Sequence, residues 1–410
     1  MTWLDLAPDS LFGLANLPYG VFSADGAQPR PGSAIPPDPR VVRVGVRIGD
    51  SVLDLAGVLG DPVFAEPSLN AFMAQGPDRW SEARAQVTEL LTAERHRGAV
   101  EAALYPLSGV RLHLPFTPGD YVDFFGNEFH AANAGRIFRP GAEPLAPNWK
   151  YLPVGYHGRS GSIVLSGTPV IRPRGQRKGP QDSAPQFGPS RRLDFEAEVG
   201  FVLGTDSPLG TPLAVGEFAD HVFGAFLLND WSARDLQAWE SQPLGPFLAK
   251  SFGTSISPWI VPLDALEHAR ISPPPRDTEL LPYLADIDKW GLDLALEVRL
   301  NGHVVARPPF ATMYWTPAQM LAHMTVNGAS TRTGDLYASG TVSGPDRSQR
   351  GCLLELSWGG AEPLTLADGS VRTFLEDADE VTITATAPGA SGARIGFGEV
   401  TGQILPAIAS

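Results

Sequence analysis

The chain of 410 residues is 43% hydrophobic and 19% charged. These values are typical of a globular protein and exclude a largely disordered one, and the length favours two domains. The formal net charge of −14 argues against nucleic-acid and anionic-membrane partners, because both need a basic surface. The net charge does not exclude a small anionic substrate, because a local cluster of Arg, Lys or metal can make the electrostatic potential inside one cleft positive.

A single cysteine, Cys352, excludes an intrachain disulfide framework and a zinc site built from several cysteines. The sequence shows neither the basic and apolar runs of a signal peptide nor an apolar stretch of membrane-spanning length. We therefore expect a cytoplasmic protein. The 44 glycines and 39 prolines are spread along the chain, which favours short strands joined by turns and so a β-rich fold.

The N-terminal region, residues 1–114, alternates strand-like segments with proline-rich loops. Residues 41–55 predict two strands joined by a hairpin turn at Gly49-Asp50. Residues 80–96 predict an amphipathic helix that ends near Gly98. We expect a small barrel that carries a helix.

From Pro115 the pattern changes to many strands separated by Gly, Pro and Asn turns, as in residues 160–173, 194–204, 222–230, 292–306 and 379–389. One clear helix interrupts them. Thr316 is its expected N-cap, Pro317 fits its first turn and Gly328 its C-terminal stop.

The strand predicted over 194–203 carries the most informative side chains. Period-2 alternation places Asp194, Glu196 and Glu198 on one face, with neighbouring Cα atoms roughly 6.5–7 Å apart. Such carboxylates can share a cation. The alternative is a solvent-exposed strand face, against which the following apolar run, residues 200–203, argues.

A second segment, residues 222–240, delivers Asp230 to the end of an apolar strand. Arg234 and Gln237 follow at helical spacing, so they share one face. Polar groups at the end of a buried strand are favoured places for catalysis. The alternative is that Asp230 only caps a helix and pairs with Arg234.

A third segment, residues 120–139, contains Asp123, His130 and Arg139. A lone histidine is more often structural than catalytic, and no histidine pair has the spacing of a zinc site. A site built from Asp and Glu selects Mg²⁺, Ca²⁺ or Mn²⁺.

Long ordered motifs over nearly the whole chain make the sequence similar to the fumarylacetoacetate hydrolase family. The motifs occupy residues 16–23, 148–170, 191–201, 227–240, 243–259, 313–328, 334–344, 353–358 and 394–400. The resemblance implies a mainly β fold with few helices, formed by a small SH3-like N-terminal barrel over 1–114 and a larger C-terminal mixed β-roll or β-sandwich over 115–410. It also implies a homodimer.

The resemblance further implies the residues of the site. Carried onto matching positions, the metal ligands are Asp123, Glu196, Glu198 and Asp230, with Ca²⁺ or Mg²⁺ bound, and Lys250 and Thr254 lie close to a magnesium position. The implied catalytic residues are His130 as general base, Glu355 as its partner, and Arg234, Gln237 and Lys250 as donors to the developing negative charge. The implied substrate contacts are Phe125, Arg139, Tyr156, Gln237, Ser241 and Thr341.

Two of these positions depart from the family pattern, because Phe125 and Ser241 stand where relatives often have tyrosine. The implied reaction is hydrolysis of the carbon–carbon bond of 4-fumarylacetoacetate to fumarate and acetoacetate, the last step of tyrosine and phenylalanine breakdown. The departures bear on substrate preference and leave the metal ligands and the His130–Glu355 pair untouched.

Two other functions stay open from the sequence. An acylpyruvate hydrolase or oxaloacetate decarboxylase of the same superfamily would share the carboxylate site, although such chains are generally shorter. A non-catalytic calcium-stabilised binding protein would need neither His130 nor Glu355. Glu355, flanked by Leu354 and Leu356, has the further alternative of an ordinary strand residue that faces solvent.

Overall fold

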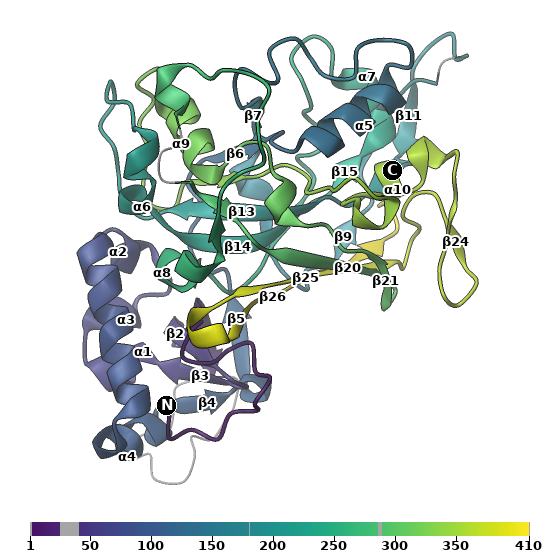
Figure 1. Cartoon of the computed structure of the whole chain (residues 1–410). Coiled ribbons are helices and arrows are strands. Elements are labelled where there is room, and N and C mark those ends of the chain that lie inside the picture. The colour runs from purple at the N-terminus through teal and green to yellow at the C-terminus, as the bar shows by residue number, and fades with distance from the viewer. Residues whose placement is uncertain (1, 25–40, 180, 286–288, 410) are drawn as a thin grey trace.

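The computed structural model describes residues 2–24, 41–179, 181–285 and 289–409. An antiparallel five-stranded sheet of order β4-β3-β2-β1-β5 occupies the N-terminal part (Figure 1). Its strands are β1 (Tyr19–Ala24), β2 (Arg43–Ile48), β3 (Ser51–Asp54), β4 (Leu104–Pro106) and β5 (Val110–His113). The predicted hairpin is confirmed, with β2 and β3 joined at Gly49, whose φ of 55° suits a glycine.

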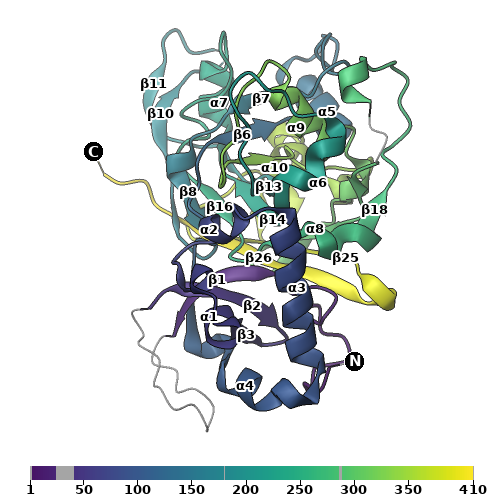
Figure 2. The same ribbon diagram turned by 90° about the vertical axis from the view of Figure 1, so that its left-hand side faces the viewer.

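Four helices accompany this sheet: α1 (Leu55–Leu59), α2 (Asn70–Met73), α3 (Pro77–Thr92) and α4 (Arg97–Ala102). Helix α3 runs along one side of the sheet (Figure 2). The prediction of one helix ending near Gly98 was wrong about both ends. The helix begins at Pro77, which suits a first turn, and ends where Ala93 turns extended (φ −88°, ψ 116°).

The rest of the chain forms two larger sheets and several two-stranded ones. The eight-stranded sheet has the order β7-β6-β22-β13-β14-β16-β8, and β17 also pairs with β14. Its strands are β6 (Tyr121–Phe124), β7 (Gly155–His157), β8 (Ile163–Leu165), β13 (Ala197–Leu203), β14 (Val222–Asp230), β16 (Thr254–Ile256), β17 (Val261–Pro262) and β22 (Leu336–Ala338).

The second large sheet has the order β21-β20-β25-β26-β9, and in Figure 1 its long strands β25 and β26 run past the N-terminal part. Its strands are β9 (Val170–Ile171), β20 (Ala295–Leu300), β21 (His303–Ala306), β25 (Glu380–Pro388) and β26 (Arg394–Leu405). The two-stranded sheets are β10 (Arg174–Arg177) with β11 (Gln186–Pro189), β12 (Leu193–Asp194) with β15 (Ser232–Ala233), β18 (Arg270–Ile271) with β19 (Gly291–Leu292), and β23 (Leu364–Thr365) with β24 (Val371–Arg372).

The remaining helices are α5 (Glu128–Phe138), α6 (Phe218–His221), α7 (Arg234–Glu240), α8 (Leu263–Leu266), α9 (Pro317–Thr325) and α10 (Leu353–Leu356). The predicted capping of α9 is confirmed, since Thr316 accepts a hydrogen bond from the Gln319 N–H and Gly328 has a φ of 84°. The fold is mainly β, as predicted. The domain boundary after Leu114 stays a prediction.

The central strands β13 and β14 are buried on both faces, and this explains their continuous apolar sequences. Phe201 in β13 packs into the core shared with the second large sheet. Val202, its neighbour, and Phe223 in β14 pack instead into the core of the N-terminal part. The N-terminal part and the eight-stranded sheet therefore share one core, on the face of the sheet to which Val202 and Phe223 point.

Phe223 provides a test of this shared core. Its ring lies 5.3 Å from Trp80, 5.4 Å from Tyr19 and 5.7 Å from Phe72, measured between centroids. We expect Phe223→Ala to lower the free energy of unfolding by about 3–5 kcal/mol, because the truncation opens a cavity in the core. Chemical denaturation measures this loss. Phe187→Ala, at a side chain that is 68% exposed, is the control and should change stability by less than about 0.5 kcal/mol. Equal effects of the two variants would contradict the shared core.

Candidate active site

Four carboxylates meet across the neighbouring strands β6, β22, β13 and β14 of the eight-stranded sheet. One oxygen each of Asp123, Glu196, Glu198 and Asp230 lies within 4.8 Å of the others, and all four residues are buried. Asp123 is on β6, Glu198 is on β13 and Asp230 ends β14. Strand β22 lies between β6 and β13 and pairs with both, so it aligns Asp123 with the others. The predicted ligand set is thus brought together.

The strand predicted over 194–203 is interrupted at Phe195 and Glu196, between β12 and β13. At the break, the Glu196 N–H donates to the side-chain oxygen of Asn229 (3.1 Å), and the Asp230 N–H donates to the Glu196 carbonyl (3.2 Å). Glu196 and Glu198 still face the cluster, whereas Asp194 does not join it. The alternative of a solvent-exposed strand face is wrong, because residues 193–204 are all buried.

A backbone amide fixes Glu198. The Gly340 N–H donates to Glu198 Oε2 at 3.1 Å. Gly340 has a φ of 77°, and a Cβ there would lie 2.2 Å from the Phe124 carbonyl oxygen. Only glycine therefore allows this loop to approach β6 closely enough to supply the N–H.

Two buried cations flank the carboxylate cluster. Lys250 Nζ lies 2.7 Å from Asp230 Oδ2 and also contacts Glu196 Oε2. Arg234 Nη1 lies 2.8 Å from Glu196 Oε1. Burial alone would raise the pKa of Glu196, but Lys250 and Arg234 bring that pKa below its ordinary value. Glu196 is therefore a carboxylate even without a metal ion.

For Asp123 and Glu198, Lys250 compensates too little to offset the other influences on their pKa values. Burial, together with the neighbouring carboxylates, raises the pKa of both well above the ordinary value. Asp123 Oδ1 and Glu198 Oε1 are buried and accept no hydrogen bond from any residue that the structure describes. Unpaired buried acceptors are costly, and oxygen-only ligands suit a hard divalent cation. The four residues therefore fit a Ca²⁺ or Mg²⁺ site by their own chemistry.

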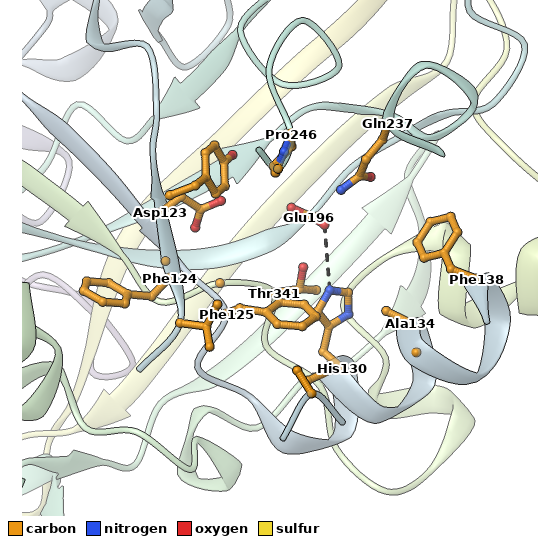
Figure 3. A pocket seen from close by; sticks show the side chains of 18 of the residues that line it. Asp123, Phe124, Phe125, His130, Ala134, Phe138, Glu196, Gln237, Pro246 and Thr341 are labelled. Atoms are coloured by element: carbon orange, nitrogen blue, oxygen red, sulfur yellow. Dashed lines mark ion pairs between the residues drawn. The ribbon is translucent and has the colours of Figure 1, made fainter. Parts of the chain in front are cut away.

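A histidine–carboxylate pair lies beside this cluster. Asn127 caps α5 and accepts the His130 N–H, which orients the first turn of the helix. His130 Nδ1 lies 2.6 Å from Glu355 Oε2, and Nε2 lies 3.8 Å from Glu196 Oε1 (Figure 3). Glu355 is 0% exposed and belongs to the short helix α10, so the alternative of a solvent-facing strand residue is wrong.

The sequence interpretation missed two side chains that hold Glu355. Asn133 donates to Glu355 Oε1 at 2.9 Å, and Ser343 donates to Oε2 at 2.7 Å. Burial raises the pKa of Glu355, but His130 and these donors bring it below its ordinary value. Asn133 lies three residues after His130, so helical spacing offered a signal for it, whereas Ser343 gave none.

A cavity of about 450 Å³ connects the cluster and the pair (Figure 3). The predicted site residues that line it are Asp123, Phe125, His130, Arg139, Tyr156, Glu196, Glu198, Arg234, Gln237, Lys250 and Thr341. Its apolar wall includes Phe125, whose ring packs edge-on against His130 at 5.3 Å, and Phe138 at the far end of α5.

The other predicted residues lie near the cavity but not in its wall. Asp230 and Thr254 line a neighbouring cavity of about 250 Å³ that shares Tyr156 and Lys250 with the first. Asp230 ends strand β14, and α7 starts only at Arg234, so the alternative of Asp230 as a helix cap is wrong. The Ser241 hydroxyl donates to the Gln237 carbonyl at 2.6 Å, and Ser241 is not among the described residues that line either cavity.

A mainly β scaffold that buries a carboxylate cluster able to hold a cation beside an oriented imidazole is typical of a metal-assisted hydrolase. The chain belongs to the fumarylacetoacetate hydrolase family. The model of the fumarylacetoacetate hydrolase C-terminal region matches residues 123–404, and that of the fumarylacetoacetase N-terminal region matches residues 15–115.

Several relatives match over the full length. The fumarylacetoacetase of Bos taurus is 45% identical, covering 100% of this chain and 99% of its own. That of Homo sapiens is 44% identical with the same coverage, and that of Oryza sativa is 44% identical, covering 99% of this chain and 97% of its own. Both parts of the chain therefore have counterparts in these enzymes.

Solved structures support the fold. The fumarylacetoacetate hydrolase of Exiguobacterium antarcticum has a TM-score of 0.55 at 19% identity, covering 95% of this chain and 99% of its own. The maleylpyruvate hydrolase of Sphingobium has a TM-score of 0.51 at 16% identity, covering 89% and 97%. Within the described ranges, we find no helix with the length and apolar character that crossing a membrane requires.

Because one oxygen of Glu198 is unpaired, we expect Glu198→Gln to affect the metal-bound and the metal-free protein differently. We expect Glu198→Gln to weaken binding of Ca²⁺ or Mg²⁺ by about 100-fold, as a charged ligand is lost. The same variant should leave the metal-free protein as stable as the unmodified one or more stable, because a neutral amide avoids the burial cost and the repulsion by neighbouring carboxylates that oppose an ionised Glu198. Calorimetric titration and thermal unfolding with and without chelator measure both effects.

Asp335→Asn is the control for Glu198→Gln. Asp335 is a buried carboxylate that accepts the N–H groups of Asp120 and Arg332 and does not belong to the cluster. Its variant should leave metal affinity unchanged. Unaltered metal affinity in Glu198→Gln would exclude Glu198 as a ligand.

Proposed function

We propose that this protein hydrolyses the carbon–carbon bond of 4-fumarylacetoacetate, giving fumarate and acetoacetate in the last step of tyrosine and phenylalanine breakdown. The observation that carries the proposal is that His130, paired with Glu355, and the carboxylate cluster open onto one cavity. The full-length similarity to fumarylacetoacetases supports it.

In the proposed mechanism His130 is the general base. Because Glu355 is a carboxylate, the 2.6 Å contact assigns the proton to Nδ1 of the imidazole. Nε2 then has a free lone pair on the cavity side and can take a proton from water. Glu355 also stabilises the imidazolium that results, as the acid does in other carboxylate–histidine pairs.

The attacking hydroxide adds to the ketone carbon that is bonded to the carbon–carbon double bond, and the carbonyl oxygen becomes an alkoxide. Arg234 Nη2 and Thr341 Oγ1 are buried and have no hydrogen-bond partner among the described residues. Both residues line the cavity, as does Gln237. Donors of this kind, already in place and desolvated, stabilise an oxyanion without reorganisation.

Collapse of the alkoxide breaks the bond to the methylene carbon, and the electron pair leaves on the acetoacetate part as an enolate. A divalent cation held by Asp123, Glu196, Glu198 and Asp230 would supply Lewis-acid stabilisation of this negative charge. The His130 imidazolium, or Lys250, delivers the proton to the methylene carbon. Water thus contributes OH to fumarate and H to acetoacetate, so atoms and charge balance.

We also propose roles for the cavity residues at the two ends of the substrate. Arg139 lines the cavity at the end of α5 and offers a cation for a substrate carboxylate. Tyr156, whose hydroxyl donates to Asp230 at 3.2 Å, and Thr341 are placed for substrate oxygens. Phe125, which lines the cavity, would shape the fit without a phenol hydroxyl, and Ser241 would act only through its hydrogen bond to the Gln237 carbonyl.

The metal site, assembly and location are part of the proposal. We assign Asp123, Glu196, Glu198 and Asp230 as ligands, with Ca²⁺ or Mg²⁺ as the ion. Four carboxylates carry −4, and a divalent ion with Lys250 and Arg234 returns +4, so a dianionic substrate meets a nearly neutral site. Thr254, whose hydroxyl lies 3.5 Å from Asp230, belongs to an adjoining magnesium position. We also propose a homodimer, which the family resemblance implies, and a cytoplasmic location, which the sequence features predict; sedimentation would test the dimer.

The substrate assignment predicts turnover of 4-fumarylacetoacetate, followed as loss of its ultraviolet diketo-enol absorbance and appearance of fumarate. Chelation should abolish this turnover, and adding back Ca²⁺ or Mg²⁺ should restore it, because the cluster cannot stabilise an enolate by itself. Acylpyruvates assayed in parallel are the comparison. Activity on acylpyruvates alone would replace the proposed substrate, and no activity on any diketo acid would favour a binding protein.

The hydrogen bond between His130 and Glu355 leads to a prediction for the activity of Glu355→Gln. We expect kcat to fall by about 10²–10⁴-fold, because the amide cannot stabilise the imidazolium or fix the tautomer in the same way. Metal content should stay unchanged, since Glu355 is not a member of the cluster. Steady-state kinetics and metal analysis measure both. Phe187→Ala serves again as the variant with ordinary activity, and a Glu355→Gln enzyme with ordinary kcat would remove Glu355 from the mechanism.

A further inference from the structure

Asp194 is a buried carboxylate beside the active site that the proposed mechanism does not use. It ends β12 and is 0% exposed. It lines neither cavity of the site, and it is not a member of the carboxylate cluster. A carboxylate removed from water in this way requires strong partners.

Four donors satisfy Asp194. Oδ1 accepts the backbone N–H groups of Phe195 (2.9 Å) and Leu353 (2.7 Å). Oδ2 accepts the Leu354 N–H (2.9 Å) and Arg234 Nε (2.9 Å). Every partner is a donor, so the position needs a group that only accepts hydrogen bonds. An asparagine amide cannot replace it, because its NH₂ end would face two donors.

These four bonds join two parts of the machinery that lie far apart in sequence. Leu353 and Leu354 are the first residues of α10, the four-residue helix that presents Glu355 to His130. Arg234 is the first residue of α7, and its Nη1 contacts Glu196. One carboxylate therefore holds the partner of the general base and the main oxyanion donor in a fixed relation.

We propose that Asp194 is a positioning residue for the carbon–carbon hydrolysis and acts through Glu355 and Arg234. The inference rests on the proposed function. Glu355 matters most when positive charge develops on the imidazole, and Arg234 when negative charge develops on the alkoxide. Loss of their alignment should therefore lower kcat far more than it changes KM.

A purely structural role would affect stability alone, and the chain offers a matched control for it. Asp379 is 2% exposed and accepts hydrogen bonds from Arg372 Nε (2.9 Å), Asn301 Nδ2 (2.8 Å) and the Glu376 N–H (2.7 Å). It is thus also a buried carboxylate with an arginine and a backbone amide. It precedes β25 and lines neither cavity of the site.

The experiment compares Asp194→Asn and Asp379→Asn in the full-length, metal-loaded enzyme, at a temperature where circular dichroism shows both folded. For Asp194→Asn we expect kcat to fall by about 100-fold, with KM within about threefold of its original value and metal content unchanged. For Asp379→Asn we expect kcat within about twofold of the unmodified enzyme.

A double-mutant cycle distinguishes positioning from general damage. If Asp194 acts partly through Glu355, then Asp194→Asn combined with Glu355→Gln should lose much less than the product of the two single losses. Asp379→Asn combined with Glu355→Gln should show simple multiplication. A kcat of Asp194→Asn like that of Asp379→Asn, or losses that multiply in both cycles, would overturn the proposal.

Asp194→Ser enters the same comparisons if Asp194→Asn does not fold, because the smaller side chain leaves room for a water molecule to accept the freed N–H groups. Failure of both variants to fold would assign Asp194 to the fold and overturn the proposal as well. Should the unmodified enzyme and Asp379→Asn not turn over 4-fumarylacetoacetate, the proposed function fails. If the unmodified enzyme and Asp379→Asn do turn over 4-fumarylacetoacetate, and Asp194→Asn has the same kcat, then only the inference about Asp194 fails.

Discussion

The rest of the site depends on the burial of four carboxylates in one small volume. Two unit charges 4.8 Å apart repel by roughly 3–4 kcal/mol at an effective dielectric constant of about 20. Lys250, which contacts Glu196 and Asp230, and Arg234, which contacts Glu196, offset part of this repulsion. Asp123 and Glu198 keep unpaired oxygens. The four carboxylates therefore suit a cation that the chain itself does not supply. The fold must hold them together against their mutual repulsion.

The sheet can do so because its central strands are covered on both faces. β13 and β14 pack against the second large sheet on one side and against the N-terminal part on the other. Their ends cannot move toward water without opening both cores. None of the described residues of the N-terminal part lines the cavity, yet this part covers one face of β13 and β14. It therefore packs behind the strands that carry Glu198 and Asp230.

The sequence could predict those features that neighbouring residues determine. The hairpin at Gly49, the capped helix after Thr316 and the alternation that turns Glu196 and Glu198 to one side are all local. The interruption at Phe195 could not be predicted, because the side chain of Asn229 on another strand satisfies the Glu196 N–H. The helix that carries Glu355 was equally hidden.

That helix has only four residues, too few for a periodic pattern, and Asp194 binds its first N–H groups from 160 positions away. Family resemblance placed Glu355 beside His130, whereas composition and spacing could not. The same holds for Asp123, which reaches the cluster through parallel pairing of β6 with β22. Long-range pairings of this kind leave no trace in a short window of sequence.

The position of His130 between two carboxylates shows why the buried cations matter for the chemistry. Glu355 lies 2.6 Å from Nδ1, and Glu196 lies 3.8 Å from Nε2. A base that takes a proton from water through Nε2 needs that nitrogen without a hydrogen-bond partner. At 3.8 Å, Glu196 Oε1 is beyond hydrogen-bond distance of Nε2, and Arg234 and Lys250 hold the two oxygens of Glu196. The ion pairs that anchor the cluster therefore also leave Nε2 open to the cavity for the proposed role of His130 as base.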